Sequence, residues 1–235
     1  MRESRVFGYL VLSMTLLLLA VVSLAHGGFE DGQEAYEGGD YVKAYKEFKI
    51  LAERGSVEAQ LKLALMYEAG RGVDKNTSEA GKWFRKAAEQ GSAEAQLKLG
   101  LMYDSGQGVS KNYAEALKWF NKAAAHGVAE AQYNLGVMYH EGQGVQRDYA
   151  EALKWLSKAA VQGLADAQTN LGVMYYKGEG VQQDFVQAYM WFDLAAGRGN
   201  AKARKYRDRV AENMTASQIA EAKRLVLEPK PKGQY

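Results

Sequence analysis

A block of thirty-six residues recurs along most of this chain and constrains the fold more than any other feature. The segments that begin at Ala95 and Ala131 agree at 22 of 36 positions. A fixed period of this length is typical of solenoids, in which each unit is one supersecondary motif that packs on its neighbours. The period therefore predicts a stack of units, with full repeats at 59–94, 95–130, 131–166 and 167–202.

Each unit is predicted to be a pair of helices. Ala59, Leu63, Met66 and Tyr67 share one helical face, and Gly70 suits the left-handed residue that ends a helix. The second helix begins at an Asn or Asp that stands three residues before a Glu or Gln, which is the spacing of a capping box. These cap residues are Asn76, Asn112, Asp148 and Asp184.

The apolar residues of each pair are too large to be buried within one unit. A tryptophan recurs on the second helix, and a small residue on the first helix should let the two helices approach closely. Because one hairpin cannot cover its own aromatic side chains, the units must stack. We therefore expect an all-α solenoid with a core tryptophan at Trp83, Trp119, Trp155 and Trp191 and a small residue at Ala64, Gly100, Gly136 and Gly172.

The two ends of the repeat region differ from the full units. Residues 26–58 keep part of the pattern and are predicted to form a shortened N-terminal repeat, in which Glu47 takes the place of the tryptophan. Terminal repeats of a solenoid are often atypical because one side faces water. Thr215 and Gln218 have capping-box spacing, so residues 203–228 are predicted to be a C-terminal capping helix region, and 229–235 a disordered tail.

The first twenty-five residues have the pattern of an export signal. Arg2 and Arg5 precede an uncharged run, and Ser23 and Ala25 place small residues at the two positions that a signal peptidase reads. Cleavage after residue 25 would release a periplasmic or secreted protein. The alternative is an uncleaved anchor that tethers the repeats to the membrane, since about twenty apolar residues can span a bilayer.

Composition and motifs argue against several other classes of protein. The net charge of +2 gives no support for a nucleic-acid partner, and the absence of cysteine excludes disulfides and thiolate chemistry. The three histidines, His26, His126 and His140, do not form a pair at helical ligand spacing, and we expect no metal and no cofactor. Each Gly-x-Gly pair follows a helix rather than a strand, so it is interpreted as a turn and not as a phosphate loop.

The repeat resembles the Sel1-like repeat family, a relative of the tetratricopeptide repeat. The resemblance rests on the pattern A-Q-x-x-L-G-x-M-Y-x-x-G-x-G-V-x-x-(D/N)-x-x-x-A-x-x-W and covers roughly residues 29–228. It implies a right-handed superhelix of antiparallel helix pairs that binds a protein or peptide, as exported bacterial adaptors of this family do. Some relatives have been linked to β-lactam hydrolysis, so a cell-envelope enzyme is the alternative. No serine here precedes a lysine by three positions, which disfavours that alternative, and we expect a monomeric, non-enzymatic adaptor.

Positions that vary between units are free to carry binding specificity. In the resembling family the first helices line the concave side, and spacing places the variable residues on one face of those helices. Leucines on this face could equally pack between neighbouring first helices. The expected partner-binding groove consists of Lys62, Leu65, Glu68, Lys98, Leu101, Asp104, Tyr133, Asn134, Val137, His140, Thr169, Asn170, Val173 and Tyr176.

A cluster of basic residues near the C-terminus is a second candidate surface. Within its own segment it is opposed only by Asp208. The cluster could be a solvated helix face, or it could dock an acidic partner or an anionic membrane surface. Its members are Arg198, Lys202, Arg204, Lys205, Arg207 and Arg209.

Overall fold

The computed structural model describes residues 28–228. The predicted signal segment at 1–25 and the predicted disordered tail at 229–235 therefore lie outside the described residues. Within 28–228 every regular element is a helix and no strand occurs, which confirms the all-α class. The chain divides into two compact units, the first reaching residue 95 and including 107–109, the second formed by 96–106 and the residues from 110 onward. Each unit is described by itself.

The first unit contains the predicted N-terminal repeat and the first full repeat. A helical segment at 28–37 is followed by α2 (Tyr41–Glu53), α3 (Val57–Ala69) and α4 (Thr77–Glu89). The pair formed by residues 28–37 and α2 is joined by a short turn, as expected for a shortened repeat. Ala44, Phe48 and Leu51 of α2 are buried, and α2 packs against α3, which packs against α4.

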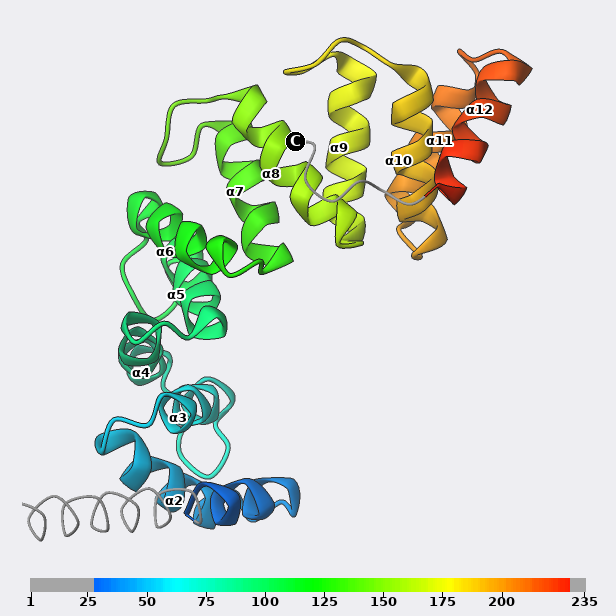
Figure 1. Ribbon diagram of the computed structural model, residues 1–235. Helices are drawn as coiled ribbons and strands as arrows, with labels where there is room; N and C mark the ends of the chain where they lie inside the picture. The colour runs from blue at the N-terminus through cyan, green and yellow to red at the C-terminus, as the bar shows by residue number, and fades with distance from the viewer. Residues whose placement is uncertain (1–27, 229–235) are drawn as a thin grey trace, which may run out of the picture. The chain divides into compact units, whose positions relative to one another are not determined.

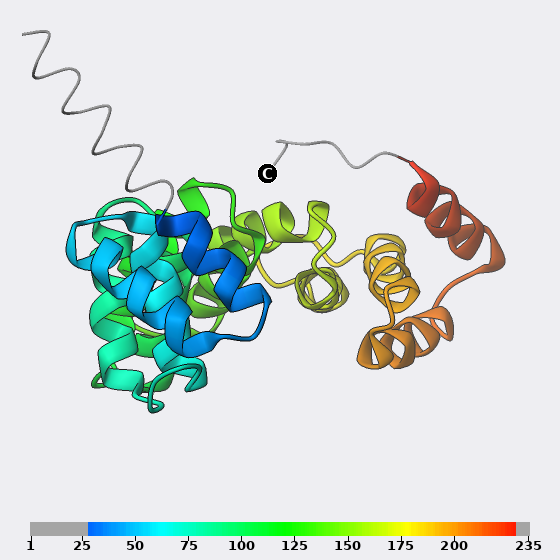
Figure 2. The same ribbon diagram turned by 90° about the horizontal axis from the view of Figure 1, so that it is seen from below.

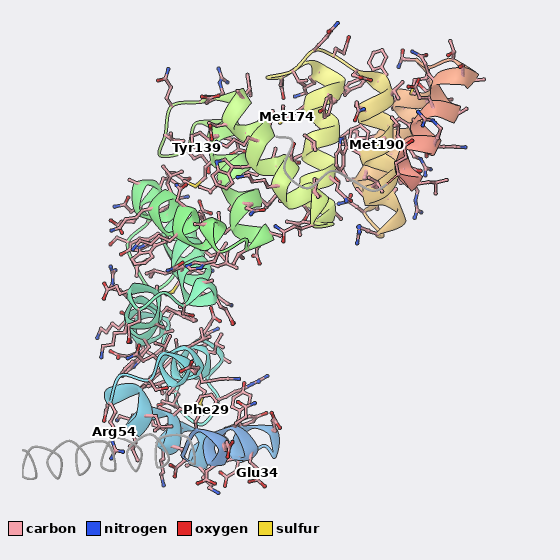
Figure 3. The ribbon with its side chains drawn as sticks, viewed as in Figure 1. Phe29, Glu34, Arg54, Tyr139, Met174 and Met190 are labelled. Carbon is pink, nitrogen blue, oxygen red and sulfur yellow. The ribbon has the colours of Figure 1, made fainter. Side chains whose placement is uncertain are left out.

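The second unit continues the alternation of helices to the end of the described chain. Neighbouring helices from α6 to α11 pack in sequence, and α10 also contacts α12 (Figures 1 and 2). Met174 and Met190, labelled in Figure 3, belong to its buried core. The helices are α5 (Ala93–Ser105), whose first three residues belong to the first unit, α6 (Tyr113–Ala125), α7 (Ala129–Glu141), α8 (Tyr149–Val161), α9 (Ala165–Lys177), α10 (Phe185–Gly197), α11 (Ala201–Ala211) and α12 (Ala216–Leu227).

The thirty-six-residue period is kept by the helices. The first helices of the four full repeats begin at residues 57, 93, 129 and 165, two positions before the frame chosen from the sequence. None of the described helices is both long and apolar enough to cross a membrane.

The Gly-x-Gly pairs form turns, and their two glycines have different roles. Gly142 ends α7 with φ 74°, and its N–H donates to Met138 O at 2.8 Å. A Cβ on Gly144 would lie 2.6 Å from Tyr113 Cβ and 2.8 Å from the Tyr113 carbonyl carbon. The first glycine therefore permits the left-handed conformation, whereas the second also permits close contact with the start of α6.

The predicted helix caps form, but the predicted capping boxes form only in part. The side chain of Asn76 accepts a hydrogen bond from Glu79 N–H, whereas Asn76 N–H donates to Tyr67 O at 2.9 Å. Because that cap N–H is already used, Glu79 pairs instead with Lys82. The reciprocal box is present at Thr215 and Gln218, as predicted. The arrangement of the first cap recurs at Asn112, Asp148 and Asp184, each of which accepts from a first-turn N–H and donates its own N–H to Tyr103, Tyr139 or Tyr175.

The small residues of the first helices allow close packing, as predicted. A Cβ on Gly100 or Gly172 would lie 2.6 or 2.7 Å from the nearest ring carbon of the phenylalanine on the following helix. The expectation that all four tryptophans are core residues is wrong at one position. Trp83, Trp119 and Trp191 are buried, but Trp155 is half-buried.

Candidate binding surface

Two cavities open on either side of α9 in the second unit. Both are lined by members of the groove that the sequence predicts, and they share Asn170 and Val173. Because α9 separates them, its exposed face can contact whatever enters either cavity. The arrangement is therefore suited to an extended ligand rather than to one small molecule.

The smaller cavity has a volume of about 130 Å³ and lies between α7, α8 and α9. Val137, His140 and Val173, three members of the predicted groove, contribute to it. Leu156 forms an apolar part of its wall. Its complete lining is Val137, His140, Glu141, Leu156, Asn170 and Val173.

The larger cavity has a volume of about 400 Å³ and lies between α9, α10 and α11. It combines aromatic and aliphatic side chains with three cationic ones, and both of the sequence-derived surfaces contribute to it. Ligand pockets commonly have volumes of roughly 300–1,000 Å³ and a mostly apolar lining with a few polar groups. Its lining is Asn170, Val173, Tyr176, Lys177, Phe192, Lys202, Tyr206, Arg209 and Val210.

His140 is held in place by a carboxylate from the turn after α9. Its Nε2 lies 2.8 Å from Glu179 Oε2, and Lys177 Nζ lies 3.3 Å from Glu179 Oε1. Burial raises the pKa of Glu179, but the hydrogen bonds from His140 and Lys177 outweigh it, so the pKa is lowered overall. The imidazole ring also lies against Tyr149, with centroids 5.2 Å apart. No cluster of three or more potential metal ligands occurs among the described residues.

Polar members of the predicted groove differ in how far they can reach a ligand. The pKa of Tyr133 is raised overall. Burial and the nearby Asp166 raise it, and a hydrogen bond with Asn170 opposes them only in part. The Asn134 amide donates to Glu130 O on its own helix at 2.9 Å. Thr169 was expected in the groove, but it is 3% exposed and its hydroxyl donates to Ala165 O, so it presents no binding group there.

The remaining members of the predicted groove do not reach either cavity. Lys62, Leu65 and Glu68 are half-buried in the first unit, where the Lys62 ammonium lies 5.8 Å from the centre of the Tyr36 ring. Lys98, Leu101 and Asp104 on α5 are also half-buried. The cavities thus involve only the α7 and α9 part of the predicted groove.

The predicted basic cluster is divided among different environments. Arg207 pairs with Asp193 of α10 at 2.8 Å and with Asp208, and these hydrogen bonds raise the pKa of its guanidinium. Arg198 packs over Gly163 in the turn after α8. Arg204 and Lys205 are exposed on α11 and line neither cavity. Only Lys202 and Arg209 reach the larger cavity.

Six residues that line the cavities were missed as site residues by the sequence reasoning, namely Glu141, Leu156, Lys177, Phe192, Tyr206 and Val210. Extending the thirty-six-residue register by one more unit would have identified Tyr206, because it corresponds to Asn170 of the predicted groove; Val210 corresponds to Met174, a buried core residue outside that groove. In the same register Lys202 corresponds to Asp166 and Arg209 to Val173. The α11 helix therefore continues the series of first helices, and its variable positions complete the cavity.

Comparisons with known proteins agree with this architecture. A Sel1 repeat protein from Oxalobacter formigenes is 33% identical, with 83% of this chain and 84% of that chain covered and a TM-score of 0.72. The Escherichia coli protein c5321, described as a protective antigen of uropathogenic strains with an SLR fold, is also 33% identical, with 86% of this chain and 52% of that chain covered and a TM-score of 0.58. Pseudomonas aeruginosa PilF shares the fold at 20% identity, with 86% and 91% covered and a TM-score of 0.58. The comparison with curated proteins gave no significant match.

The repeats also match a family model directly. The Sel1 repeat model matches residues 57–92, 93–128, 129–164 and 165–200, in the same phase as the first helices of the structure. Repeats of this kind are typical of protein-interaction scaffolds. The matched ranges span more than half of the chain, which therefore belongs to the Sel1 repeat family.

Proposed function

We propose that this protein is an exported, non-enzymatic adaptor that binds a segment of another protein along α7, α9 and α11. The observation that carries the proposal is the pair of cavities on either side of α9, because together they offer two adjacent side pockets lined by α7, α9 and α11. Scaffold repeats commonly bind extended segments in this way. Export is supported by the pattern of residues 1–25.

The chemistry of the surface supports recognition of a peptide. Tyr176 and Tyr206 provide rigid contact area, and aromatic residues are enriched among the side chains that dominate binding energy. The Asn170 amide has two donor hydrogens and one acceptor oxygen, so a single hydrogen bond with Tyr133 leaves capacity for a peptide backbone.

Site-specific photo-crosslinking in the native cell tests the binding surface. A photoreactive benzoylphenylalanine at Tyr176 should give a discrete covalent adduct with one partner. The same group at Val42, which is 56% exposed on α2 in the first unit, is the control. An adduct pattern that is identical at the two positions, or no adduct at Tyr176, would contradict the proposed surface.

A pair of matched asparagines then tests which residues of the surface matter. Asn134 and Asn170 occupy equivalent positions of consecutive repeats, but only Asn170 lines the cavities. Asn170→Ala should weaken the adduct formed from position 176, whereas Asn134→Ala should leave it unchanged. Equal effects of the two changes would show that the cavities are not the contact.

N-terminal sequencing of the mature protein tests export. A chain that begins at His26 in the periplasm or the medium is the expected result. Detection of Met1 on a membrane-bound form would replace release by anchoring.

A further inference from the structure

The larger cavity carries a net positive charge. Of its three cationic residues, Lys177 is compensated by Glu179 at 3.3 Å. Lys202 and Arg209 are exposed at the rim, and the nine residues that line the cavity include no aspartate or glutamate. Arg207 on the same helix is different, because Asp193 and Asp208 both pair with it. The cavity therefore presents two cations that are available to an incoming anion.

The floor of the same cavity is apolar. Phe192 is 1% exposed and Val210 is 2% exposed, and Val173 lies beside them. The Tyr206 ring packs against Phe192, with centroids 5.4 Å apart. The Lys202 ammonium lies 5.7 Å from the centre of the Tyr206 ring, so that cation is held beside the apolar floor. A ligand that fits both parts must carry a negative group next to an apolar one.

We propose that the cavity between α9, α10 and α11 binds a protein segment in which an aspartate or glutamate stands beside an aliphatic or aromatic residue. The carboxylate pairs with Arg209 and Lys202, and the neighbouring side chain lies on Phe192, Val173 and Val210. A guanidinium can bind a carboxylate through two parallel hydrogen bonds, which makes Arg209 the anchor of the acidic group. This inference rests on the proposed adaptor function and names the chemical class of its partner.

The form of the site favours a peptide over a lipid surface. A flat membrane contacts cations that are exposed on the surface, as Arg204 and Lys205 are. Lys202 and Arg209 instead border a hollow of about 400 Å³ that also contains the Asn170 amide. That combination provides a pocket for a side chain and a partner for a peptide backbone.

Selection from a random peptide library with blocked ends tests the proposal and needs no purified partner. The purified repeat protein is expected to enrich heptapeptides in which Asp or Glu adjoins an aliphatic or aromatic residue, relative to the unselected library. A synthesised winner, acetylated and amidated, is then used as the probe in a fluorescence anisotropy titration. Replacement of its acidic residue by Gln or Asn should weaken binding at least about tenfold at low salt.

Charge reversal provides the matched control. Lys202→Glu with Arg209→Glu should abolish enrichment of acidic peptides and shift selection toward Lys or Arg. Arg204→Glu with Lys205→Glu changes the net charge of α11 equally but leaves the cavity lining intact. This second variant should keep the wild-type preference and affinity within about twofold. Circular dichroism should show that both variants remain helical.

The possible failures have different meanings. The library could yield peptides that have no acidic bias but whose binding is lost in the Asn170→Ala, Tyr176→Ala variant. That result would overturn the inference about charge and would leave the proposed adaptor surface supported. A library that yields no binder would count against both. The protein could instead sediment with phosphatidylserine vesicles, equally dependent on the 202/209 pair and on the 204/205 pair, while no acidic peptides are enriched. That result would show that the ligand of the basic residues is a membrane surface rather than a peptide.

Discussion

Truncation of Trp119 should damage the stack far more than truncation of Trp155. The two residues occupy the same position of consecutive repeats, but Trp119 is 2% exposed and Trp155 is half-buried. Each indole also contacts the lysine three residues later, with the ammonium 4.5 Å from the ring centre in both cases. The cation–π contact therefore cancels in the comparison, because it is lost in both variants.

The structure sets the size of the difference. Replacing a buried tryptophan by alanine costs about 3–5 kcal/mol through lost transfer energy and the remaining cavity. Trp119→Ala also removes the hydrogen bond from its Nε1 to Glu115 at 3.2 Å, worth roughly 0.5–1.5 kcal/mol. Trp155 is partly exposed, so Trp155→Ala loses a smaller share of the transfer energy and leaves a smaller cavity than Trp119→Ala. The free energy of unfolding should thus differ by about 1 kcal/mol or more between the variants.

Urea unfolding followed by far-ultraviolet circular dichroism measures this difference. Because each repeat is stabilised mainly by its neighbours, Trp119→Ala should also separate the transition into more than one phase. Hydrogen exchange should then show early loss of protection in α5 and α6, while α9 and α10 remain protected. Equal destabilisation by the two changes, or a single unaltered transition for Trp119→Ala, would refute the assignment of Trp119 as the more deeply buried residue.

Three further changes test other parts of the fold. Gly136→Ala should lower the free energy of unfolding by about 1–3 kcal/mol in urea denaturation, because the new Cβ would lie 2.5 Å from Leu156 Cγ. Gly197→Ala is the control, because its Cβ would meet no atom within 4 Å and the change should be neutral or stabilising. Asp148→Ala removes the acceptor of two first-turn N–H groups and should cost about 1 kcal/mol in the same measurement, an effect absent from a Ser replacement that restores the cap. The lowered pKa of Glu179 means that its ionised form stabilises the fold, so wild type should exceed Glu179→Gln in stability above the ordinary carboxyl pKa and lose that advantage as the pH falls through the lowered one. Urea unfolding over a series of pH values measures this, and an advantage that does not shrink as the pH falls would contradict it.

The sequence was sufficient for the architecture because the repeat supplies the same evidence several times. Ala59, Leu63 and Met66 are buried as their spacing predicts, and Gly70 ends α3 in the left-handed conformation. One unit alone would leave the helix boundaries uncertain, but four copies in register reduce that ambiguity.

The details of capping could not be read from the sequence. The spacing of Asn76 and Glu79 is compatible with a reciprocal box, but the box also needs a free N–H on the cap residue. That N–H is bound to Tyr67 O of the preceding helix, a contact that depends on how the turn folds back. At Thr215 the cap N–H donates to the Gln218 side chain instead of to a backbone carbonyl, and the box forms.

The candidate site was only partly predictable for a related reason. Spacing places Asn170, Val173 and Tyr176 on one face of α9, but it does not show that Lys202 and Arg209 approach them. Thr169 illustrates the opposite error, since its spacing places it beside the exposed face, but it is 3% exposed and its hydroxyl donates to Ala165 O of its own helix. Which members of a variable face are accessible depends on packing between helices.

The close contact of the second turn glycine has a consequence for how such an array can change over generations. Gly72, Gly144 and Gly180 each lie against the residue 31 positions earlier, which is Tyr41, Tyr113 or Tyr149. An insertion or deletion of one residue between the two partners would move the glycine out of register with the backbone of the earlier tyrosine. Gain or loss of a whole thirty-six-residue block leaves every such pairing intact. Selection can therefore vary the number of units freely while the length of each unit stays fixed, so that new binding specificity arises by duplication and side-chain replacement rather than by longer loops.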